Sequence, residues 1–354
     1  MKICLVVGAR PNLMKVAPVI REIKKYPDIE YTLVHTGQHY STNMSDVFFE
    51  DLEIPEPDVN LGVKSTKTTI IDLVSNVFMS KKPDVVVVFG DVDSTMYTAI
   101  AASKAGYKLA HVEAGMRSFD RTMPEEINRI VTDVLSDFLF VATQYDIDNL
   151  LKEGVDRTKI FHVGDIMIDN LQYNLPLTRN IQTPEGPYIL LTLHRPSNVD
   201  VKENLKPILQ ATSELSKKIK VIFPIHPRTE KMIRSFELGK YIREVQIVEP
   251  MRYLDFLAFM IKSKAVVTDS GGMQVETTAL NVPCITLREN TERPYTVEKG
   301  TNLLVGRNKD KIIEETFKVI SGNQKWALIN GGQWFDGRAS ERIVKILYEN
   351  FTKK

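Results

Sequence analysis

The most informative segment of the sequence is Ala265-Val266-Val267-Thr268-Asp269-Ser270-Gly271-Gly272-Met273-Gln274-Val275-Glu276. It predicts a short apolar strand, a tight turn with two glycines and the beginning of a helix. Such a turn leaves backbone N–H groups exposed at a helix N-terminus, where a phosphate group binds well. Glu276 follows one turn into the helix, where its carboxylate could accept bonds from sugar hydroxyls. A turn that merely requires glycine explains the same residues equally well.

Short apolar strands alternate with amphipathic helical patterns along the rest of the chain. Continuous apolar strands predict parallel sheets that are covered by helices on both faces. The predicted strands are Ile3–Val7, Tyr31–His35, Val85–Phe89, Leu109–Val112, Phe138–Ala142, Tyr188–Leu193, Lys220–Ile225, Val245–Val248, Ala265–Thr268 and Cys284–Leu287.

The length of 354 residues predicts two domains, because one ordinary core does not grow to that size. We expect an α/β protein with two Rossmann-like, doubly wound domains that face a cleft. The predicted boundaries are 1–172 for the first domain, 173–187 for a linker rich in Pro and Gly, and 188–337 for the second. A last helix in 338–354 could pack back on the first domain. Ligands of such sheets bind at the carboxyl ends of the strands.

Composition excludes several classes of protein. Lys and Arg number 46 and Asp and Glu number 45, so the net charge of +1 offers no basic surface for nucleic acid. The apolar runs are too short to span a bilayer, and no secretory signal pattern begins the chain. The two cysteines, Cys4 and Cys284, fall within apolar strands and are expected to be buried free thiols. These features predict a cytoplasmic protein without a membrane partner.

Cationic residues follow the first strand. Arg10 falls in the turn and Lys15 in the first part of the next helix. Cations near a helix N-terminus oppose the helix dipole, and an anionic ligand is one reason for their presence. For Lys15 taken alone, a solvent-facing side chain is the favoured interpretation.

Three carboxylates lie just after a predicted strand or at the beginning of a predicted helix. Asp91 could cap the helix after it, whereas Glu113 has no obvious structural purpose and is interpreted as functional. Glu125 fits a capping box with Thr122 and an ion pair with Arg129, four residues on. Glu126, Asn128 and Arg129 could equally form a solvated helix face.

Two strands of the second half end in a histidine and an arginine. His194 and Arg195 follow one of them, and His226 and Arg228 follow the other. Basic groups at these strand ends suit a phosphate group or a developing negative charge. No pair of histidines has the spacing of a zinc site, so no metal is expected.

Taken together and in this order, the motifs resemble those of the non-hydrolysing UDP-N-acetylglucosamine 2-epimerases over residues 1 to about 320. The resemblance implies a fold like that of type B glycosyltransferases, a UDP-sugar in the cleft, a homodimer, and no nicotinamide or obligatory metal cofactor. The motifs are Gly8-Ala9-Arg10-Pro11 with Lys15, Gly90-Asp91, His111-Val112-Glu113-Ala114-Gly115-Met116-Arg117, Pro124-Glu125-Glu126-Ile127-Asn128-Arg129, His194-Arg195, Asp269-Ser270-Gly271-Gly272 and Thr291-Glu292-Arg293-Pro294.

The resemblance also implies roles for particular residues. The catalytic group would be Asp91, Glu113, Glu125 and His194. The substrate would be bound by Arg10, Lys15, Ser270, Gly271, Gly272, Glu276, Arg293, Phe256 and the backbone near Met251. The implied reaction inverts carbon 2 of the sugar through elimination and re-addition of UDP, with a 2-acetamidoglucal intermediate.

Two departures from the family pattern bear on the substrate. Many bacterial members carry Gln-His-x-Gln at an activator site, whereas this chain has Gln38-His39-Tyr40-Ser41. The segments 8–12 and 43–49 are closer to relatives that act on diacetamido-uronic acid sugars. One alternative is therefore a 2-epimerase of such a uronic acid sugar, and another is a hydrolysing epimerase. A UDP-sugar glycosyltransferase is a third alternative, but it would have no use for Glu113 and Glu125. The last is a catalytically silent nucleotide-sugar sensor, which would not need the carboxylates.

Overall fold

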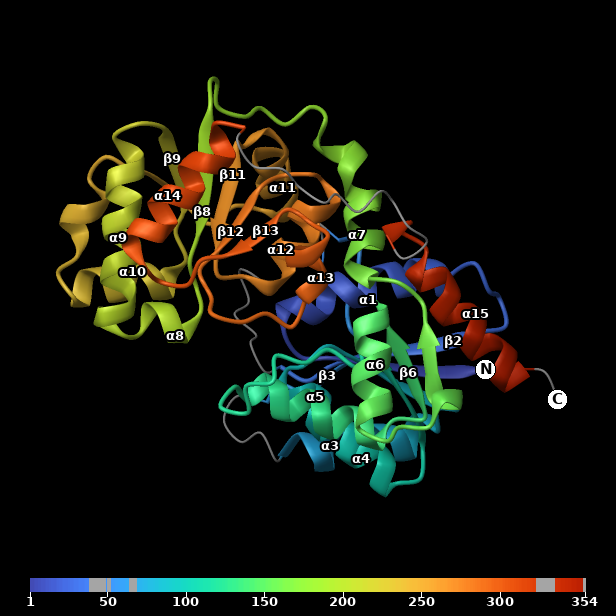
Figure 1. The fold of residues 1–354 in the computed structure, drawn as a ribbon. Helices are drawn as coiled ribbons and strands as arrows, with labels where there is room; N and C mark the ends of the chain where they lie inside the picture. The colour runs from blue at the N-terminus through green and yellow to red at the C-terminus, as the bar shows by residue number, and fades with distance from the viewer. Residues whose placement is uncertain (38–48, 50–51, 64–68, 323–334, 353–354) are drawn as a thin grey trace. The chain divides into compact units, whose positions relative to one another are not determined.

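The structure is a computed structural model that describes residues 1–37, 49, 52–63, 69–322 and 335–352. The chain forms two compact units (Figure 1). Unit 1 comprises Met1–Tyr173 and Gly331–Lys354, and unit 2 comprises Asn174–Asn330. In the described residues, no helix combines the length and apolar character that a membrane crossing needs.

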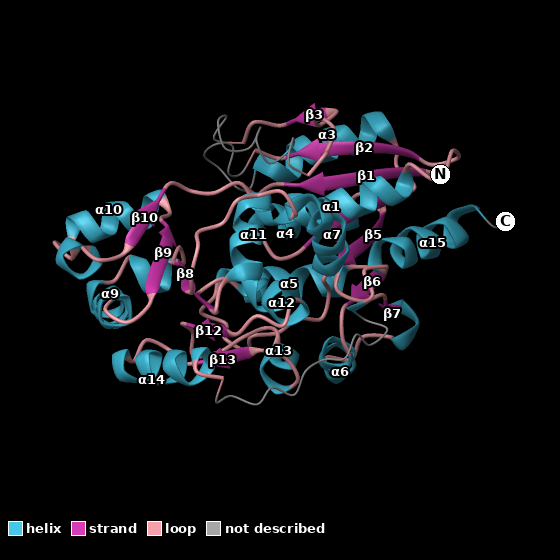
Figure 2. Cartoon of the chain, turned by 90° about the horizontal axis from the view of Figure 1, so that it is seen from above, coloured by secondary structure: helices cyan, strands magenta, loops and turns pink. Residues whose placement is uncertain are grey.

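Unit 1 contains a seven-stranded sheet in the order β3-β2-β1-β4-β5-β6-β7. Every pairing is parallel, and the arrowheads of β1, β2 and β3 point the same way in Figure 2. The strands are β1 (Lys2–Val7), β2 (Glu30–His35), β3 (Val59–Asn60), β4 (Val85–Phe89), β5 (Lys108–Val112), β6 (Phe138–Val141) and β7 (Ile160–His162).

Most helices of unit 1 pack on this sheet through buried apolar side chains, whereas the helix Pro124–Leu135 buries polar ones, namely Glu126, Asn128, Arg129, Thr132 and Asp133. The C-terminal helix packs on α1, and the rings of Tyr348 and Tyr26 lie 5.2 Å apart. The helices are α1 (Arg10–Ile23), α3 (Thr69–Lys81), α4 (Asp93–Lys104), α5 (Pro124–Leu135), α6 (Gln144–Lys152), α7 (Ile166–Asn174), α15 (Ala339–Thr352) and the short 3-10 helix η1 (Arg157–Lys159).

Unit 2 also contains a parallel sheet, which has six strands in the order β10-β9-β8-β11-β12-β13. Its strands are β8 (Tyr188–Thr192), β9 (Lys220–Pro224), β10 (Gln246–Val248), β11 (Ala265–Thr268), β12 (Cys284–Thr286) and β13 (Asn302–Leu304). Its helices are α8 (Pro196–Val199), α9 (Lys202–Ser216), α10 (Pro227–Ser235), α11 (Tyr253–Lys262), α12 (Gly271–Ala279), α13 (Pro294–Glu298) and α14 (Lys309–Ile320), with the 3-10 helices η2 (Leu175–Thr178) and η3 (Gly239–Ile242).

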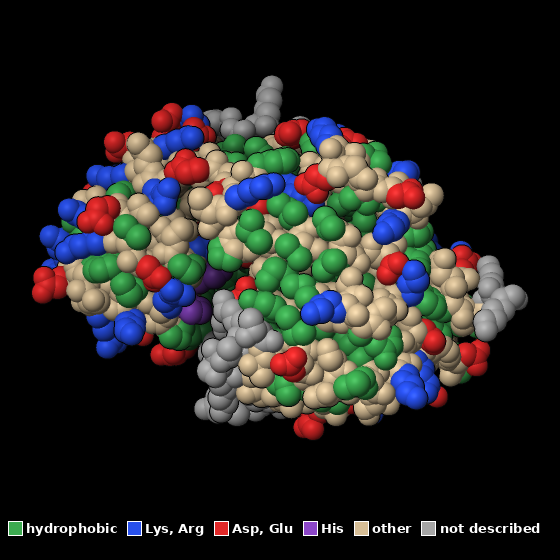
Figure 3. All heavy atoms as spheres, turned by 90° about the horizontal axis from the view of Figure 1, so that it is seen from below, with side chains coloured by type: hydrophobic (Ala, Val, Ile, Leu, Met, Phe, Trp, Pro, Cys, Tyr) green, Lys and Arg blue, Asp and Glu red, His purple; other side chains and the backbone are tan. Residues whose placement is uncertain are grey.

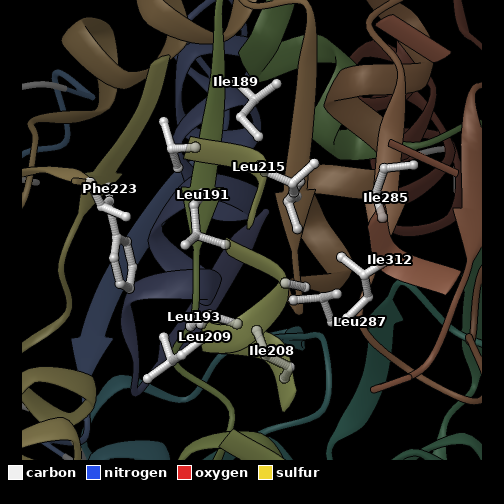
Figure 4. Close-up of a cluster of buried hydrophobic side chains, with 14 of the residues drawn as sticks. Ile189, Leu191, Leu193, Ile208, Leu209, Leu215, Phe223, Ile285, Leu287 and Ile312 are labelled. Carbon is white, nitrogen blue, oxygen red and sulfur yellow. The ribbon is translucent and has the colours of Figure 1, made fainter. Parts of the chain in front are cut away.

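A core of unit 2 lies between one face of its sheet and the helices α9 and α14. Side chains from alternate positions of β8, namely Ile189 and Leu191, pack against leucines and isoleucines of α9 and α14 (Figure 4). Burial of each such side chain contributes about 1.5–3 kcal/mol. The apolar runs therefore determine both the strands and their helical cover.

The structure contains all ten predicted strands, and it adds β3, β7 and β13, which have only two or three residues each. Residues 173–178 of the predicted linker are helical, as the end of α7 and as η2. Cys4 and Cys284 are buried and unbridged, as predicted. Burial raises the pKa of Cys4 to about 12 and that of Cys284 to about 11, so neither thiol is poised for chemistry.

Candidate active site

The strand order of each sheet identifies one edge where ligands bind. In unit 1, β1 and β4 are neighbours from which the chain winds in opposite directions, and in unit 2 the same holds for β8 and β11. Ligands of open parallel sheets bind beside the carboxyl ends of strands at such switch points. Most of the predicted site residues follow these four strands or the adjacent β5 and β12.

Lys15 and Glu113 form a buried ion pair at the edge of unit 1. Lys15 Nζ contacts Glu113 Oε2, and both side chains are less than a tenth exposed. Glu113 has a φ of 71°, in the left-handed region that residues with a side chain seldom adopt. The solvent-facing interpretation of Lys15 is therefore wrong. Arg10 begins α1, where partial burial lowers the pKa of its guanidinium.

Asp91 is held by Arg129, an arginine for which the sequence predicted a different partner. Arg129 donates to Asp91 Oδ2 from Nε at 3.1 Å and from Nη2 at 2.8 Å, and its Nη1 lies 2.5 Å from Glu126. Arg129 is only 2% exposed, and Glu126 and Asn128 are also buried. The solvated-face alternative for these residues is wrong, because this face of α5 packs beneath the loop that carries Asp91.

Glu125 lies at the beginning of α5, but not in a capping box. The N-cap residue is Met123, and the hydroxyl of Thr122 bonds instead to Asp120 at 2.6 Å. Arg129 pairs with Glu126, not with Glu125. Among the described residues, the half-buried Glu125 carboxylate makes no hydrogen bond or ion pair, so the structural role expected for it is wrong and its side chain is available for chemistry.

A buried carboxylate orients His194 in unit 2. Asp269 Oδ1 lies 3.1 Å from His194 Nδ1, and Asp269 also accepts from the backbone N–H groups of His194 and Arg195. Burial alone would raise the pKa of Asp269, but the bonds from His194 and Arg195 hold it below its ordinary value. With Nδ1 on Asp269, the partly exposed ring is left with Nε2 for another group.

The glycine turn after β11 is tightly packed. Ser270 is the N-cap of α12, and its backbone N–H donates to Thr268 Oγ1 at 3.0 Å. A Cβ on Gly271 would collide with the carboxylate of Glu292, which Arg288 holds at 2.8 Å. A side chain at position 271 would therefore require the Glu292 carboxylate to shift, while Gly272 continues the first turn of α12. The turn thus ends at a helix N-terminus, the geometry that anion binding uses, and anion binding by Ser270, Gly271 and Gly272 stays a prediction.

Helix α11 lies against the helix that carries Glu276. Tyr253 donates from its hydroxyl to Glu276 Oε1 at 2.7 Å, an interaction that no local pattern signals. The half-buried Phe256 lies one turn further along α11, and Met251 precedes it. Arg293 is buried as the N-cap of α13, with Nη1 3.2 Å from the Tyr295 hydroxyl. The activator segment 38–41 and residues 43–48 lie outside the described part of the chain.

The two parallel sheets with polar side chains at their switch points define an α/β protein of the nucleotide-binding type. The family model for UDP-N-acetylglucosamine 2-epimerase matches residues 21–348. The chain belongs to this family, and the predicted fold class is thereby confirmed.

Curated relatives and a solved structure match over nearly the full length. The UDP-N-acetylglucosamine 2-epimerase of Methanocaldococcus jannaschii is 43% identical, over 98% of this chain and 99% of the relative. The crystal structure of that archaeal enzyme in complex with UDP-GlcNAc and UDP superposes with a TM-score of 0.90 at 42% identity, covering 98% of this chain and 99% of that one. The UDP-2,3-diacetamido-2,3-dideoxy-D-glucuronate 2-epimerase of Pseudomonas aeruginosa is 39% identical, over 98% and 99% of the two chains.

Proposed function

We propose that this chain catalyses the reversible epimerisation of UDP-N-acetylglucosamine to UDP-N-acetylmannosamine. The observation that carries the proposal is the group of carboxylates at the ligand-binding edge of unit 1. Glu113 is ion-paired to Lys15, Asp91 to Arg129, and Glu125 makes no such pair among the described residues. A binding protein or sensor has no use for three acids there, whereas a reaction that moves protons on both faces of a sugar does.

The chemistry requires the departure of UDP. Carbon 2 bears an amide and no neighbouring carbonyl, so its proton is too weakly acidic for direct removal. In the elimination, the C1–O bond breaks and UDP leaves with the electron pair, while a carboxylate takes the proton from carbon 2. The 2-acetamidoglucal is then protonated at carbon 2 from the other face as UDP bonds again to carbon 1. General acid–base help contributes about 10²- to 10⁴-fold per group.

The residues divide into two groups by role. In unit 1, Asp91, Glu113 and Glu125 supply the base and acid, and Arg10 and Lys15 supply positive charge to the substrate. In unit 2, the turn Ser270–Gly272 binds the diphosphate, Glu276 the ribose, and Phe256 with the backbone near Met251 the uracil. His194, oriented by Asp269, donates toward the leaving diphosphate together with Arg293.

A second substrate is favoured by one specific relative. The Pseudomonas aeruginosa protein named as a diacetamido-glucuronate 2-epimerase is 39% identical to this chain. Both substrates are UDP-sugars with an acetamido group at carbon 2, so the same carboxylates serve either.

Proton NMR of UDP-N-acetylglucosamine incubated with the protein tests the proposal, with the UDP-diacetamido-glucuronate sugar in a parallel sample. We expect a new anomeric signal from a manno sugar still linked to UDP. Free N-acetylmannosamine together with UDP would indicate a hydrolysing enzyme instead. Turnover of the diacetamido sugar alone would assign the second substrate.

Substituting Gly271 with Ala is expected to weaken UDP binding by about tenfold, or 1.4 kcal/mol. The added methyl group displaces the Glu292 carboxylate and disturbs the backbone that holds the diphosphate. Isothermal titration calorimetry with UDP measures the effect. Gly239→Ala is the matched control, because a Cβ there meets no atom within 4 Å and affinity should not change. Equal UDP affinities for the parent, Gly271→Ala and Gly239→Ala would contradict binding of the diphosphate at this turn.

We further propose that the chain forms a homodimer through the helices α3, α4 and α5. Hydrophobic side chains gather on this face (Figure 3), where Val134 is 66% and Met79 63% exposed. Exposed apolar patches of this kind mark protein interfaces. Val134→Lys is expected to shift the protein from dimer to monomer in analytical ultracentrifugation. Leu151→Lys, which alters an exposed leucine on α6, should leave the dimer intact, and a monomeric parent would contradict the proposal.

The cytoplasm is the compartment that we propose. Cys4 and Cys284 are both reduced and buried, which fits a reducing environment. Detection of the folded protein in a cytosolic fraction would support this placement, and detection only in a secreted fraction would contradict it.

A further inference from the structure

The fully buried carboxylate of Asp133, in α5, contacts three residues of the segment that carries Glu113. Asp133 Oδ1 lies 2.6 Å from His111 Nδ1, and Oδ2 accepts from the Gly115 backbone N–H at 3.1 Å and from Arg117 Nη1 at 2.8 Å. His111, Gly115 and Arg117 all come from the end of β5 or the turn after it. Asp133 therefore contacts this segment at one residue before Glu113, His111, and at two residues after it, Gly115 and Arg117.

The other ring nitrogen of His111 reaches the loop that carries Asp91. His111 Nε2 lies 2.8 Å from the carbonyl oxygen of Gly90, the residue before Asp91. A carbonyl and a carboxylate both accept hydrogen bonds, so this geometry has the ring donating from both nitrogens. His111 thus connects Asp133 to the Asp91 loop, and the ring in this arrangement is an imidazolium.

Charge balance supports this protonation state. Arg117 also forms a two-pronged pair with Glu153, from Nε at 2.8 Å and Nη2 at 2.7 Å. With His111 positive, the charges of His111, Arg117, Asp133 and Glu153 sum to zero. Burial alone would raise the pKa of Asp133, but His111 and Arg117 hold it below its ordinary value. With a neutral ring, Arg117 would be the one cation shared between two carboxylates, of which Asp133 is fully buried and Glu153 is 34% exposed.

The turn needs such anchoring because its backbone is strained. The left-handed conformation of Glu113 costs about 1–2 kcal/mol for a residue with a side chain. The next residue, Ala114, donates its N–H to Phe140 at 3.1 Å, and a Cβ on Gly115 would lie 2.6 Å from the Asp146 carbonyl oxygen. Without Asp133, the turn loses the bond that fixes Gly115 and can relax toward ordinary φ values.

We infer that His111 and Asp133 are a positioning pair for the epimerase reaction. Asp133 holds Glu113 through the turn, and His111 holds Asp91 through Gly90, so the pair sets the spacing of two acids. The inference rests on the proposed function, and it adds two residues that do not themselves contact the reacting atoms.

Asp133→Asn in the full chain tests the pair kinetically. We expect kcat to fall about 10- to 100-fold, since a displacement of about 1 Å can cost 10²-fold, while the affinity for UDP stays within twofold. Asp169→Asn is the matched control, because Asp169 is also buried in unit 1 and accepts from the backbone N–H groups of Ala339 and Ser340. A purely structural role would lower stability in both variants and kcat in neither, and kcat within twofold of the parent in Asp133→Asn would overturn the inference.

A spectroscopic measurement separates this inference from the proposed function. ¹⁵N NMR of histidine-labelled protein at neutral pH should show one imidazolium that is absent in His111→Gln, a variant also expected to lose kcat about tenfold or more. An imidazolium in a protein without epimerase activity would refute the function and leave the buried pair intact. A neutral tautomer at His111 in an active enzyme would refute the pair and leave the function intact.

Discussion

Glu113→Gln is expected to lower kcat by about 10²- to 10⁴-fold. Glutamine keeps the size of the side chain and tolerates the same backbone conformation, but it cannot take a proton from carbon 2. UDP is proposed to bind in unit 2, so its affinity should change less than twofold. Steady-state kinetics and calorimetry with UDP measure the two quantities separately.

Glu22→Gln is the matched control for this variant. Glu22 is also a buried glutamate of unit 1 paired to a lysine, with Lys25 Nζ 2.6 Å away, but it lies at the far end of α1. Its kcat should equal that of the parent. A Glu113→Gln protein with kcat within tenfold of the parent would remove Glu113 from the catalytic group.

Lys15→Met is expected to destabilise the protein by about 3–5 kcal/mol and to reduce turnover as well. Both partners of the Lys15–Glu113 pair are buried, so loss of the lysine leaves a carboxylate without compensation away from water. The free energy of unfolding is measured by urea titration followed by circular dichroism.

Two further variants show whether charge compensation is the cause. Lys217→Met removes a lysine that is 50% exposed from its pair with Glu214, which is 43% exposed, and it should cost no more than about 1 kcal/mol. The double variant Lys15→Met with Glu113→Gln should recover most of the lost stability but none of the activity. If Lys15→Met is as stable as Lys217→Met, the Lys15–Glu113 pair contributes little to the stability of the folded state.

Most strands of the two sheets could be predicted from the sequence because they are continuous apolar runs. Val85–Phe89, for example, is buried at every position, as β4 between helices on both faces requires. The strands β3, β7 and β13 are edge strands of two or three residues, which are too few to show a pattern. A strand such as Val59–Asn60 is defined by its pairing with β2, not by its own residues.

The candidate site was predicted less completely. Side chains directly after strands, such as Asp91, Glu113 and His194, were found because topology places strand ends together. The contact of Arg129 with Asp91 and the roles of Tyr253 and Asp133 were missed because their partners lie 20 to 40 positions away along the chain. The capping prediction for Glu125 failed because Thr122 bonds to Asp120, a local competition that a four-residue motif does not reveal. The catalytic roles themselves stay predictions.

The central claim, that carbon 2 exchanges its proton while UDP departs, is tested most directly in deuterated water. We would incubate UDP-N-acetylglucosamine with the enzyme and follow both UDP-sugars by proton NMR and mass spectrometry. We expect a UDP-linked manno product that carries one deuterium at carbon 2, with Glu113→Gln producing almost none. Formation of the manno product with its original hydrogen at carbon 2 would contradict elimination and re-addition.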